Sequence, residues 1–174
     1  MKIVIVNGAP RSGKDTFVGL CLDKLGKFGF AFSTVDVVKE VAEHCGWNGE
    51  KTPKHRKFLS DLKDLLAEWN DVPYQSIRRD IARVRLLAEQ YNVDHEKFVV
   101  FIHCREPEEI ARFVKEYNAT TVIIRRPQVE SEIQSNHADK GVFDYEYDVT
   151  VYNDNTIDHL KFAVDFFLDK LLKS

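Results

Sequence analysis

KIVIVNGAPRSGKDT, residues 2–16, is the stretch that decides the fold of this 174-residue chain. Its first residues are mostly β-branched and apolar, which predicts a buried strand over Lys2–Asn7. Two glycines, Gly8 and Gly13, then bound a short loop, and a helical pattern follows through about Phe28. A strand that runs into a glycine-bounded loop and a helix is typical of a parallel α/β sheet.

Short apolar runs and longer helical patterns alternate along the rest of the chain. This alternation predicts an α/β fold with three layers, a sheet of about five parallel strands and helices on both faces, in one domain over residues 1–174. Further strands are expected at Phe30–Val35, Phe98–His103, Thr120–Ile124 and Tyr147–Tyr152. A helix is expected at Val37–Cys45, with Asp36 as its cap and Gly46 as its stop, and another from about Pro107.

Three more predicted helices each carry one apolar face, because apolar residues recur at helical spacing. The first face comprises Phe58, Leu62, Leu65, Leu66 and Trp69. The second comprises Ile77, Ile81, Val84 and Ala88. The third, in the C-terminal helix, comprises Ile157, Leu160, Val164, Phe167, Leu168 and Leu171.

Composition excludes several classes of protein. Hydrophobic residues make up 44% and charged residues 30%, as in ordinary soluble domains. A net charge of −3 gives no broad positive field, so no nucleic-acid partner is expected. No apolar run approaches a membrane span and no signal segment opens the chain, which favours a cytoplasmic protein without a membrane partner. The three cysteines form no CxxC pair, so we expect buried free thiols in a reducing compartment. We expect a monomer or a homodimer.

The glycine-bounded loop carries the chemistry. Gly8, Gly13 and Lys14 match the P-loop pattern GxxxxGK, in which backbone N–H groups surround phosphate oxygens and the lysine reaches the β- and γ-phosphates. A plain turn between a strand and a helix would need neither the second glycine nor the lysine. The sequence therefore predicts ATP binding by the loop residues Gly8, Ala9, Pro10, Arg11, Ser12, Gly13, Lys14, Asp15 and Thr16.

Asp15 departs from the P-loop pattern, which has Ser or Thr after the lysine to hold Mg²⁺. A carboxylate can meet Mg²⁺ directly or through water, so Asp15 is the predicted metal ligand. It can equally weaken nucleotide binding, because it stands close to the triphosphate. Thr16 keeps a hydroxyl near the α-phosphate, and Arg11 is either a further phosphate contact or a solvated loop residue.

The aperiodic, polar stretch Arg125–Val142 is long for a connection in a compact domain. Such segments are often active-site lids, so we expect a lid over about residues 125–143.

GKDT, residues 13–16, resembles the loop of phage-type deoxynucleoside monophosphate kinases and of the phosphomevalonate kinases that share the P-loop kinase fold. FVVFIHCREPEEI, residues 98–110, is similar to that group's strand followed by D-x-R-x-x-x-E, with Arg105 and Glu109 at matching positions. Residues 136–160 resemble its ending, with a lid histidine, a last strand and an Asn-Asp-Gly-Thr turn. Residues 46–95 match only loosely.

The resemblance implies an ATP- and Mg²⁺-dependent kinase whose acceptor site lies in a helical region, here about residues 36–95. Lys14, Arg105 and Arg126 are then expected to act in catalysis. His137 matches the lid histidine. The residues implied to bind the phosphorylated small-molecule acceptor are Asp36, Lys39, Arg56, Arg78 and Arg79. Each arginine among them can equally be a solvated or salt-bridged surface residue. The turn of Tyr152, Asn153 and Asn155 is expected beside the adenine, with Asn155 in place of the family's glycine.

His103 departs from the family pattern, because it stands where that strand ends in aspartate. Imidazole is a poor ligand for Mg²⁺, which prefers oxygen. Three outcomes stay open. Asp15 or Glu106 replaces the family's aspartate at the metal site, water and phosphates hold the metal, or the protein has drifted from the family reaction. A histidine hydrogen-bonded at a strand end is an equally good interpretation.

Phosphoryl transfer from ATP to a nucleoside or deoxynucleoside monophosphate is the leading hypothesis. The same loop and sheet serve a kinase of another phosphorylated metabolite, of the dephospho-coenzyme A or phosphomevalonate type. A non-catalytic nucleotide-binding module is the third hypothesis, and His103 keeps it open.

Overall fold

The computed structural model describes residues 1–130, 141–154 and 156–173. The chain divides into two compact units, one formed by Met1–Ala31 with Asn92–Ser174 and the other by Phe32–Tyr91. The first unit contains the glycine-bounded loop over residues 8–16, called the phosphate loop below after the P-loop pattern that it matches. The second contains all five residues expected to bind the acceptor.

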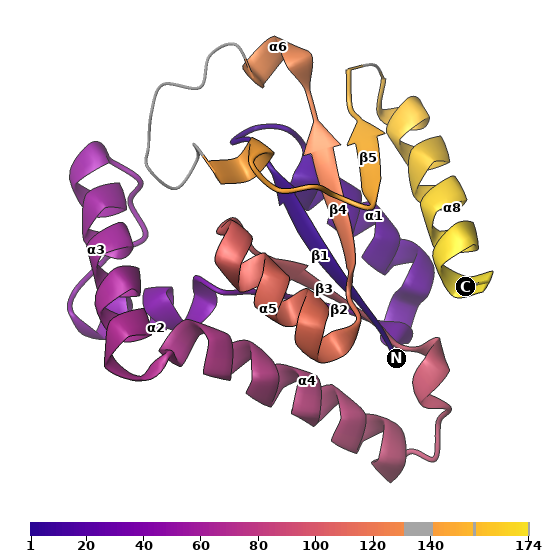
Figure 1. Ribbon diagram of the computed structural model, residues 1–174, viewed down its shortest axis with the longest axis horizontal. Helices are drawn as coiled ribbons and strands as arrows, with labels where there is room; N and C mark the ends of the chain where they lie inside the picture. Colours follow the sequence, from indigo (N-terminus) through magenta and orange to yellow (C-terminus); the bar gives the residue numbers. More distant parts are fainter. Residues whose placement is uncertain (131–140, 155, 174) are drawn as a thin grey trace. The chain divides into compact units, whose positions relative to one another are not determined.

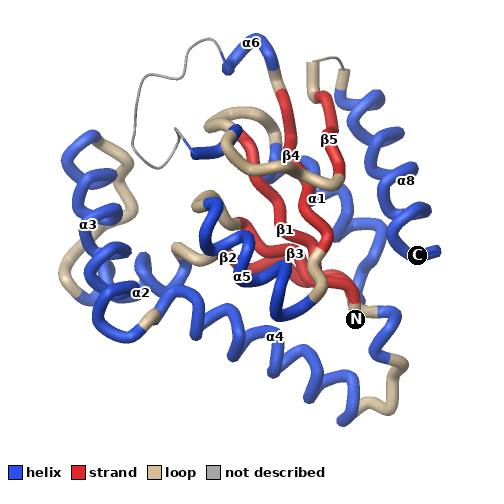
Figure 2. Tube along the Cα trace, viewed as in Figure 1, coloured by secondary structure: helices blue, strands red, loops and turns tan. Residues whose placement is uncertain are grey.

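A five-stranded sheet in the order β2-β3-β1-β4-β5 organises the molecule (Figures 1 and 2). β1 pairs in parallel with β3 and with β4, and β4 pairs in parallel with β5. The expected α/β sheet is therefore confirmed, with the strand before the phosphate loop at its centre. The strands are β1 (Lys2–Gly8), β2 (Gly29–Ser33), β3 (Val99–His103), β4 (Thr120–Arg125) and β5 (Val149–Tyr152).

Helices of the first unit cover both faces of the sheet (Figure 1). They are α1 (Lys14–Leu25), α5 (Pro107–Tyr117), α6 (Pro127–Glu130) and α8 (Ile157–Lys173), with 3₁₀ turns η1 (Gly26–Phe28), η2 (His95–Lys97) and η3 (Gly141–Phe143). The second unit contains α2 (Asp36–His44), α3 (Pro53–Asn70) and α4 (Val72–Gln90). No helix within the described ranges is long and apolar enough to cross a membrane.

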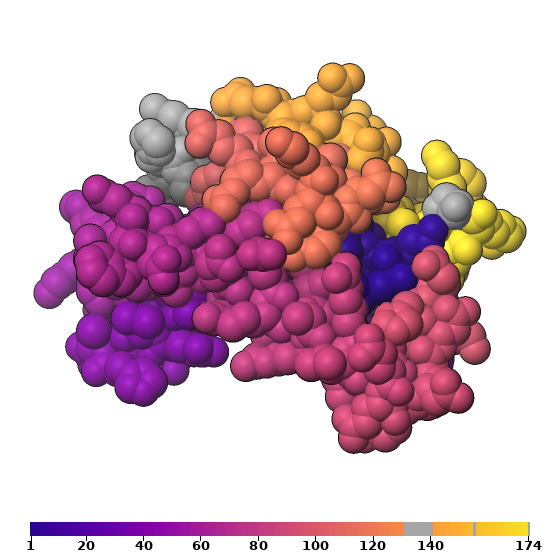
Figure 3. Space-filling view, turned by 60° about the horizontal axis from the view of Figure 1, so that its bottom comes forward, coloured from indigo at the N-terminus to yellow at the C-terminus, as the bar shows by residue number. Residues whose placement is uncertain are grey.

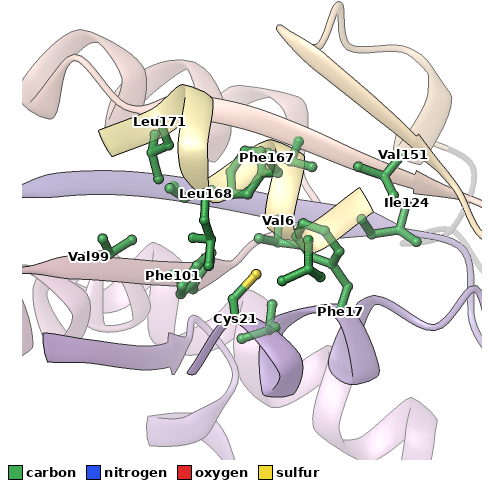
Figure 4. Packing of buried hydrophobic residues seen from close by; sticks show 14 of the residues in the cluster. Val6, Phe17, Cys21, Val99, Phe101, Ile124, Val151, Phe167, Leu168 and Leu171 are labelled. Atoms are coloured by element: carbon green, nitrogen blue, oxygen red, sulfur yellow. The ribbon is translucent and has the colours of Figure 1, made fainter. Parts of the chain in front are cut away.

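The main core lies between the sheet, α1 and α8 (Figure 4). Successive strand residues point to opposite faces, so Val4 and Val6 enter this core while their neighbours Ile3 and Ile5 are buried on the other side. Phe17 of α1 packs against Phe167 of α8, with ring centroids 5.5 Å apart. Phe101 of β3 is fully buried in the same cluster.

The edge of the first unit away from the phosphate loop is formed by the chain's first residues and η2, which lie side by side at the surface (Figure 3). The N-terminal ammonium lies 3.5 Å from Glu96 Oε1, and the backbone N–H of Lys2 donates to the carbonyl oxygen of Phe98 at 2.8 Å. The amino ends of β1 and β3 are thereby joined, so their carboxyl ends also align.

Several boundaries differ from the predicted ones, and two of them have a clear local cause. α1 ends at Leu25 rather than near Phe28, because Gly26 has φ +54° and its N–H donates to the carbonyl of Leu22. β2 ends at Ser33 rather than Val35, because the Asp36 carboxylate accepts the Ser33 N–H at 2.9 Å and holds a turn there. The prediction of Asp36 as the cap of α2 is wrong, because Val35 is the N-cap and Asp36 is the first helical residue.

The predicted apolar face of α3 is largely exposed, in contrast to the buried face of α4. Leu65 is 62% exposed and Trp69 is 81% exposed, whereas Ile77 and Ile81 of α4 are buried. Helical periodicity predicted both helices, but it cannot say which face another element covers. The start of α3 is set instead by Thr52, whose side chain accepts the His55 N–H.

The cysteines also differ from expectation at one position. Cys21 and Cys104 are buried as predicted, and burial raises the pKa of the Cys21 thiol to about 12. Cys45 is exposed, because it caps the C-terminus of α2 instead of facing a core.

Replacing Phe101 with alanine should lower the free energy of unfolding by about 3–5 kcal/mol, because it leaves a cavity in the packed core. The matched control is Phe162→Ala on α8, where the ring is 70% exposed and the change should stay within about 0.5 kcal/mol. Urea unfolding of both variants measures the difference. Equal losses in the two variants would contradict the assignment of this core.

Candidate functional site

The phosphate loop is held in a conformation that only glycine tolerates at two positions. Gly13 has φ +91°, and a Cβ there would collide with the side chain of Asn153. A Cβ on Gly8 would lie 2.6 Å from Ser12 Oγ and 2.7 Å from the carbonyl oxygen of Ile124. Both contacts are closer than real Cβ atoms show, so the spacing of the two glycines follows from packing as well as from backbone conformation.

Asn153 fastens the loop from the other side of the site. This residue follows β5, and its Nδ2 donates to the carbonyl oxygen of Ser12 at 2.9 Å. Its own backbone N–H donates to the carbonyl of Arg125 at 2.7 Å. The turn after β5, the end of β4 and the phosphate loop are therefore joined through one residue.

A pocket of about 370 Å³ opens beside this junction. Its walls come from the loop, from the start of α1, from the residue after β4 and from the start of α8. The lining residues are Arg11, Gly13, Lys14, Asp15, Thr16, Arg126, Asn153, Ile157 and Leu160. Of the residues predicted to bind ATP, the structure thus brings Asn153 to the loop and adds the predicted catalytic Arg126 to the same pocket.

Charged side chains gather at the carboxyl ends of β1 and β3. Lys14 Nζ lies 3.1 Å from Asp15 Oδ1, and His103 Nδ1 lies 3.6 Å from the same oxygen. Partial desolvation raises the pKa of the Asp15 carboxyl, but the charges of Lys14, His103 and Arg105 together lower it below its ordinary value. Asp15 is therefore ionised in the folded protein, and it interacts electrostatically with all three of these basic side chains.

Beneath the loop lies a buried amide that the sequence analysis missed. Asn7 is fully buried at the end of β1, and its Oδ1 accepts the N–H of Gly8 at 2.8 Å. Its Nδ2 donates to the carbonyl oxygen of Arg105 at 3.2 Å and to Tyr147 Oη at 2.7 Å. A polar residue that closes an otherwise apolar strand just before a glycine loop was the available signal.

Arg125 and Arg126 are adjacent but have different environments. Arg125 makes a two-point ion pair with Glu130, at 2.8 Å from Nε and 2.6 Å from Nη2, and its guanidinium lies over the Phe143 ring. This pairing lowers the pKa of the Glu130 carboxyl and raises that of Arg125. Arg126 is exposed and lines the pocket, while Glu130 accepts its backbone N–H at 3.0 Å.

The predicted acceptor residues lie in the second unit. Asp36 pairs with Lys39 at 3.1 Å, Arg56 Nε donates to the carbonyl oxygen of Lys51 at 3.1 Å, and Arg78 donates to Gln75 Oε1 at 3.2 Å. Arg79 is an exposed residue of α4. Within this unit these contacts are local, so an acceptor role for the five residues stays a prediction.

Two of the residues singled out in the sequence, Asn155 and His137, lie outside the described residues. The same holds for positions 131–140 of the expected lid. The described parts of that stretch are α6 before it and η3 after it.

Comparison with known proteins places the fold. No protein-family model matches the sequence, and no curated protein matches it either. The structure is similar to that of a "putative kinase" from Chloroflexus aurantiacus, with a TM-score of 0.51 at 12% identity over 99% of this chain and 96% of that one. This likeness shows a shared fold.

Two further solved structures align over nearly their whole length but with lower scores. A shikimate kinase from Aquifex aeolicus gives a TM-score of 0.46 at 17% identity, with 97% of this chain and 96% of that chain covered. A sugar kinase from Janibacter sp. HTCC2649 gives 0.47 at 14% identity, with 97% and 95% covered.

Substituting Gly13 with alanine should destabilise the protein by at least about 1–2 kcal/mol, because alanine resists the left-handed backbone and its Cβ collides with Asn153. The control is Gly19→Ala in the middle of α1, where a Cβ meets nothing within 4 Å and should raise stability by about 0.5–1 kcal/mol. Denaturant unfolding compares the two. A Gly13 variant as stable as the wild type would contradict the loop geometry.

Proposed function

We propose that this chain transfers the γ-phosphoryl group of ATP to a nucleoside or deoxynucleoside monophosphate. The observation that carries the proposal is the pocket in which Lys14 of a glycine-bounded loop meets Arg126 and Asn153. Its polar lining is concentrated at the loop, and Ile157 and Leu160 add apolar surface. This combination suits a triphosphate joined to a flat base.

Lys14, Arg105 and Arg126 are the proposed catalytic residues. An acceptor phosphate oxygen attacks the γ-phosphorus, the bond to the β-bridging oxygen breaks, and ADP leaves with the electron pair. Charge spreads over the equatorial oxygens of the transferring group, so positive side chains lower the barrier mainly by electrostatic stabilisation. Lys14 and Arg105 already act on one carboxylate, Asp15, which supports their convergence on a single centre.

The residues present fit Mg²⁺ at the loop. Asp15 offers an ionised carboxylate and Thr16 a hydroxyl, and both line the pocket. These are the oxygen donors that Mg²⁺ prefers, whereas His103 offers nitrogen. When bound, the metal would neutralise phosphate charge. Asp15 also pairs with Lys14 at 3.1 Å and so holds the lysine near the loop.

The acceptor class rests on the sequence resemblance. The GKDT loop, and Arg105 followed by Glu109, are the features shared with monophosphate kinases. The residues proposed to bind the acceptor phosphate are Asp36, Lys39, Arg56, Arg78 and Arg79. A nucleotide-binding module without turnover is the second candidate, because His103 takes the place of an acidic metal ligand and lies 3.6 Å from Asp15.

Adding the correct monophosphate should raise the rate of ADP release above the rate with ATP alone, and Lys14→Ala should lower that rate at least about 100-fold. A panel of nucleoside and deoxynucleoside monophosphates, read by a coupled ADP assay, makes the measurement. Lys24→Ala is the matched control, because Lys24 pairs with Asp165 at the surface. ATP binding with no stimulation by any monophosphate would favour the binding module. Stimulation by another phosphorylated metabolite would correct the acceptor class.

Replacing Asp15 with asparagine should raise the Mg²⁺ concentration needed for half-maximal activity by about 10-fold, since a neutral amide binds the cation more weakly than a carboxylate. A magnesium titration at saturating ATP measures the shift, and Asp23→Asn, an exposed change on α1, is the control. If Asp15 instead hinders the triphosphate, the asparagine variant would keep its magnesium dependence and bind ATP more tightly. That result would remove Asp15 from the metal site.

A further inference from the structure

The buried amide of Asn7 joins three parts of the first unit that are distant in sequence. It accepts from the first residue of the phosphate loop, Gly8, and it donates to the backbone carbonyl of Arg105 in the turn between β3 and α5. The same Nδ2 donates its second hydrogen to Tyr147 Oη, 140 positions along the chain. One side chain thus uses its oxygen and both amide hydrogens, and it leaves the loop, the turn and the segment before β5 little freedom to move separately.

Tyr147 extends this connection toward η3. Its hydroxyl donates to the carbonyl oxygen of Val142 at 2.9 Å while accepting from Asn7. A tyrosine hydroxyl keeps its proton at neutral pH, and burial raises the pKa of Tyr147 further, to about 12. Its ring packs edge-on against Tyr145, with centroids 5.2 Å apart.

A second contact joins the turn after β3 to the segment before β5. Gly141, at the start of η3, lies against Pro107 at the start of α5, and a Cβ there would come within 3.3 Å of the proline ring. The turn that carries Arg105 is therefore pressed between the segment before β5 and the end of β1. The charge of Arg105 reaches the Asp15 carboxyl, so the placement of this turn sets how Arg105 meets the phosphate loop.

We propose that Asn7 and Tyr147 are positioning residues, whose hydrogen bonds hold Arg105 in register with the phosphate loop for phosphoryl transfer. The proposal rests on the proposed function in taking Arg105 as a catalytic group. Asn7 and Tyr147 act only through backbone and hydroxyl contacts. Their loss should therefore lower kcat while leaving the KM for ATP nearly unchanged.

Tyr147→Phe tests the proposal because it removes a single oxygen and keeps the ring. We expect kcat to fall about 10-fold, the effect of a misplaced catalytic group, with the KM for ATP changed less than about 2-fold. Tyr145→Phe, which removes the hydroxyl of the neighbouring ring, is the matched control and should keep the wild-type kcat. An unchanged kcat in Tyr147→Phe, or equal losses in both variants, would overturn the proposal.

A double-mutant cycle shows whether Tyr147 acts through Arg105. Arg105→Ala and the double variant Arg105→Ala/Tyr147→Phe should have the same kcat, since misplacing an absent guanidinium costs nothing further. Losses that multiply would mean that Tyr147 acts independently of Arg105, and the proposal would fail.

Hydrogen exchange tests the same link without activity. The amides of Cys104, Arg105, Glu106 and Glu108 should exchange at least about 5-fold faster in Tyr147→Phe than in Tyr145→Phe. Those of β1 should stay protected, because only local opening is made easier. Unchanged exchange at these four amides would overturn the proposal even in an active enzyme. A further outcome is that the wild-type protein releases no ADP with any acceptor while the two variants still differ in exchange as expected. That result would support the hydrogen-bonded link between Tyr147 and the turn of Arg105, and it would refute the kinase function.

Discussion

The parallel pairing of β1 with β3 on one side and β4 on the other is the constraint on which the candidate site depends. The register sets Val6 opposite His103 and Gly8 opposite Ile124, so the carboxyl ends of three strands finish at one edge. Every loop that carries a proposed functional residue of the first unit leaves from that edge. Ligands of open α/β sheets bind there because the strand ends and helix N-termini meet at the same place.

The sheet and the loop could be predicted from the sequence because their signals are local. Five β-branched or apolar runs predicted the five strands. Gly8, Gly13 and Lys14 predicted a loop between the first strand and the first helix, where the structure has it. Gly13 shows why this works. Its backbone conformation and its contact with Asn153 each exclude a side chain, so a glycine at this position indicates a tight loop.

The remaining features depend on contacts that no local pattern contains. Asn7 gained its role from Arg105 and Tyr147, which are 98 and 140 positions away. The apolar residues of α3, Trp69 among them, recur at the spacing of a buried helix face, yet this face is largely exposed. Cys45 is exposed for a similar reason, since it stands at a helix end. In each case the residue type was compatible with either environment, and only the fold selected one.

Arg125 and Arg126 are neighbours of the same residue type, and the fold gives them different environments. Arg125 ends β4 opposite Tyr152, and its side chain is taken by Glu130 and the ring of Phe143. An arginine whose charge and two N–H donors are paired with a carboxylate is poorly placed to bind a phosphate as well. Arg126 follows the strand end and faces the pocket, and the Glu130 oxygen that pairs with Arg125 also accepts its backbone N–H. Glu130 thus holds both the side chain of Arg125 and the backbone of Arg126. Of this pair, Arg126 is therefore the one that suits the proposed role in phosphoryl transfer.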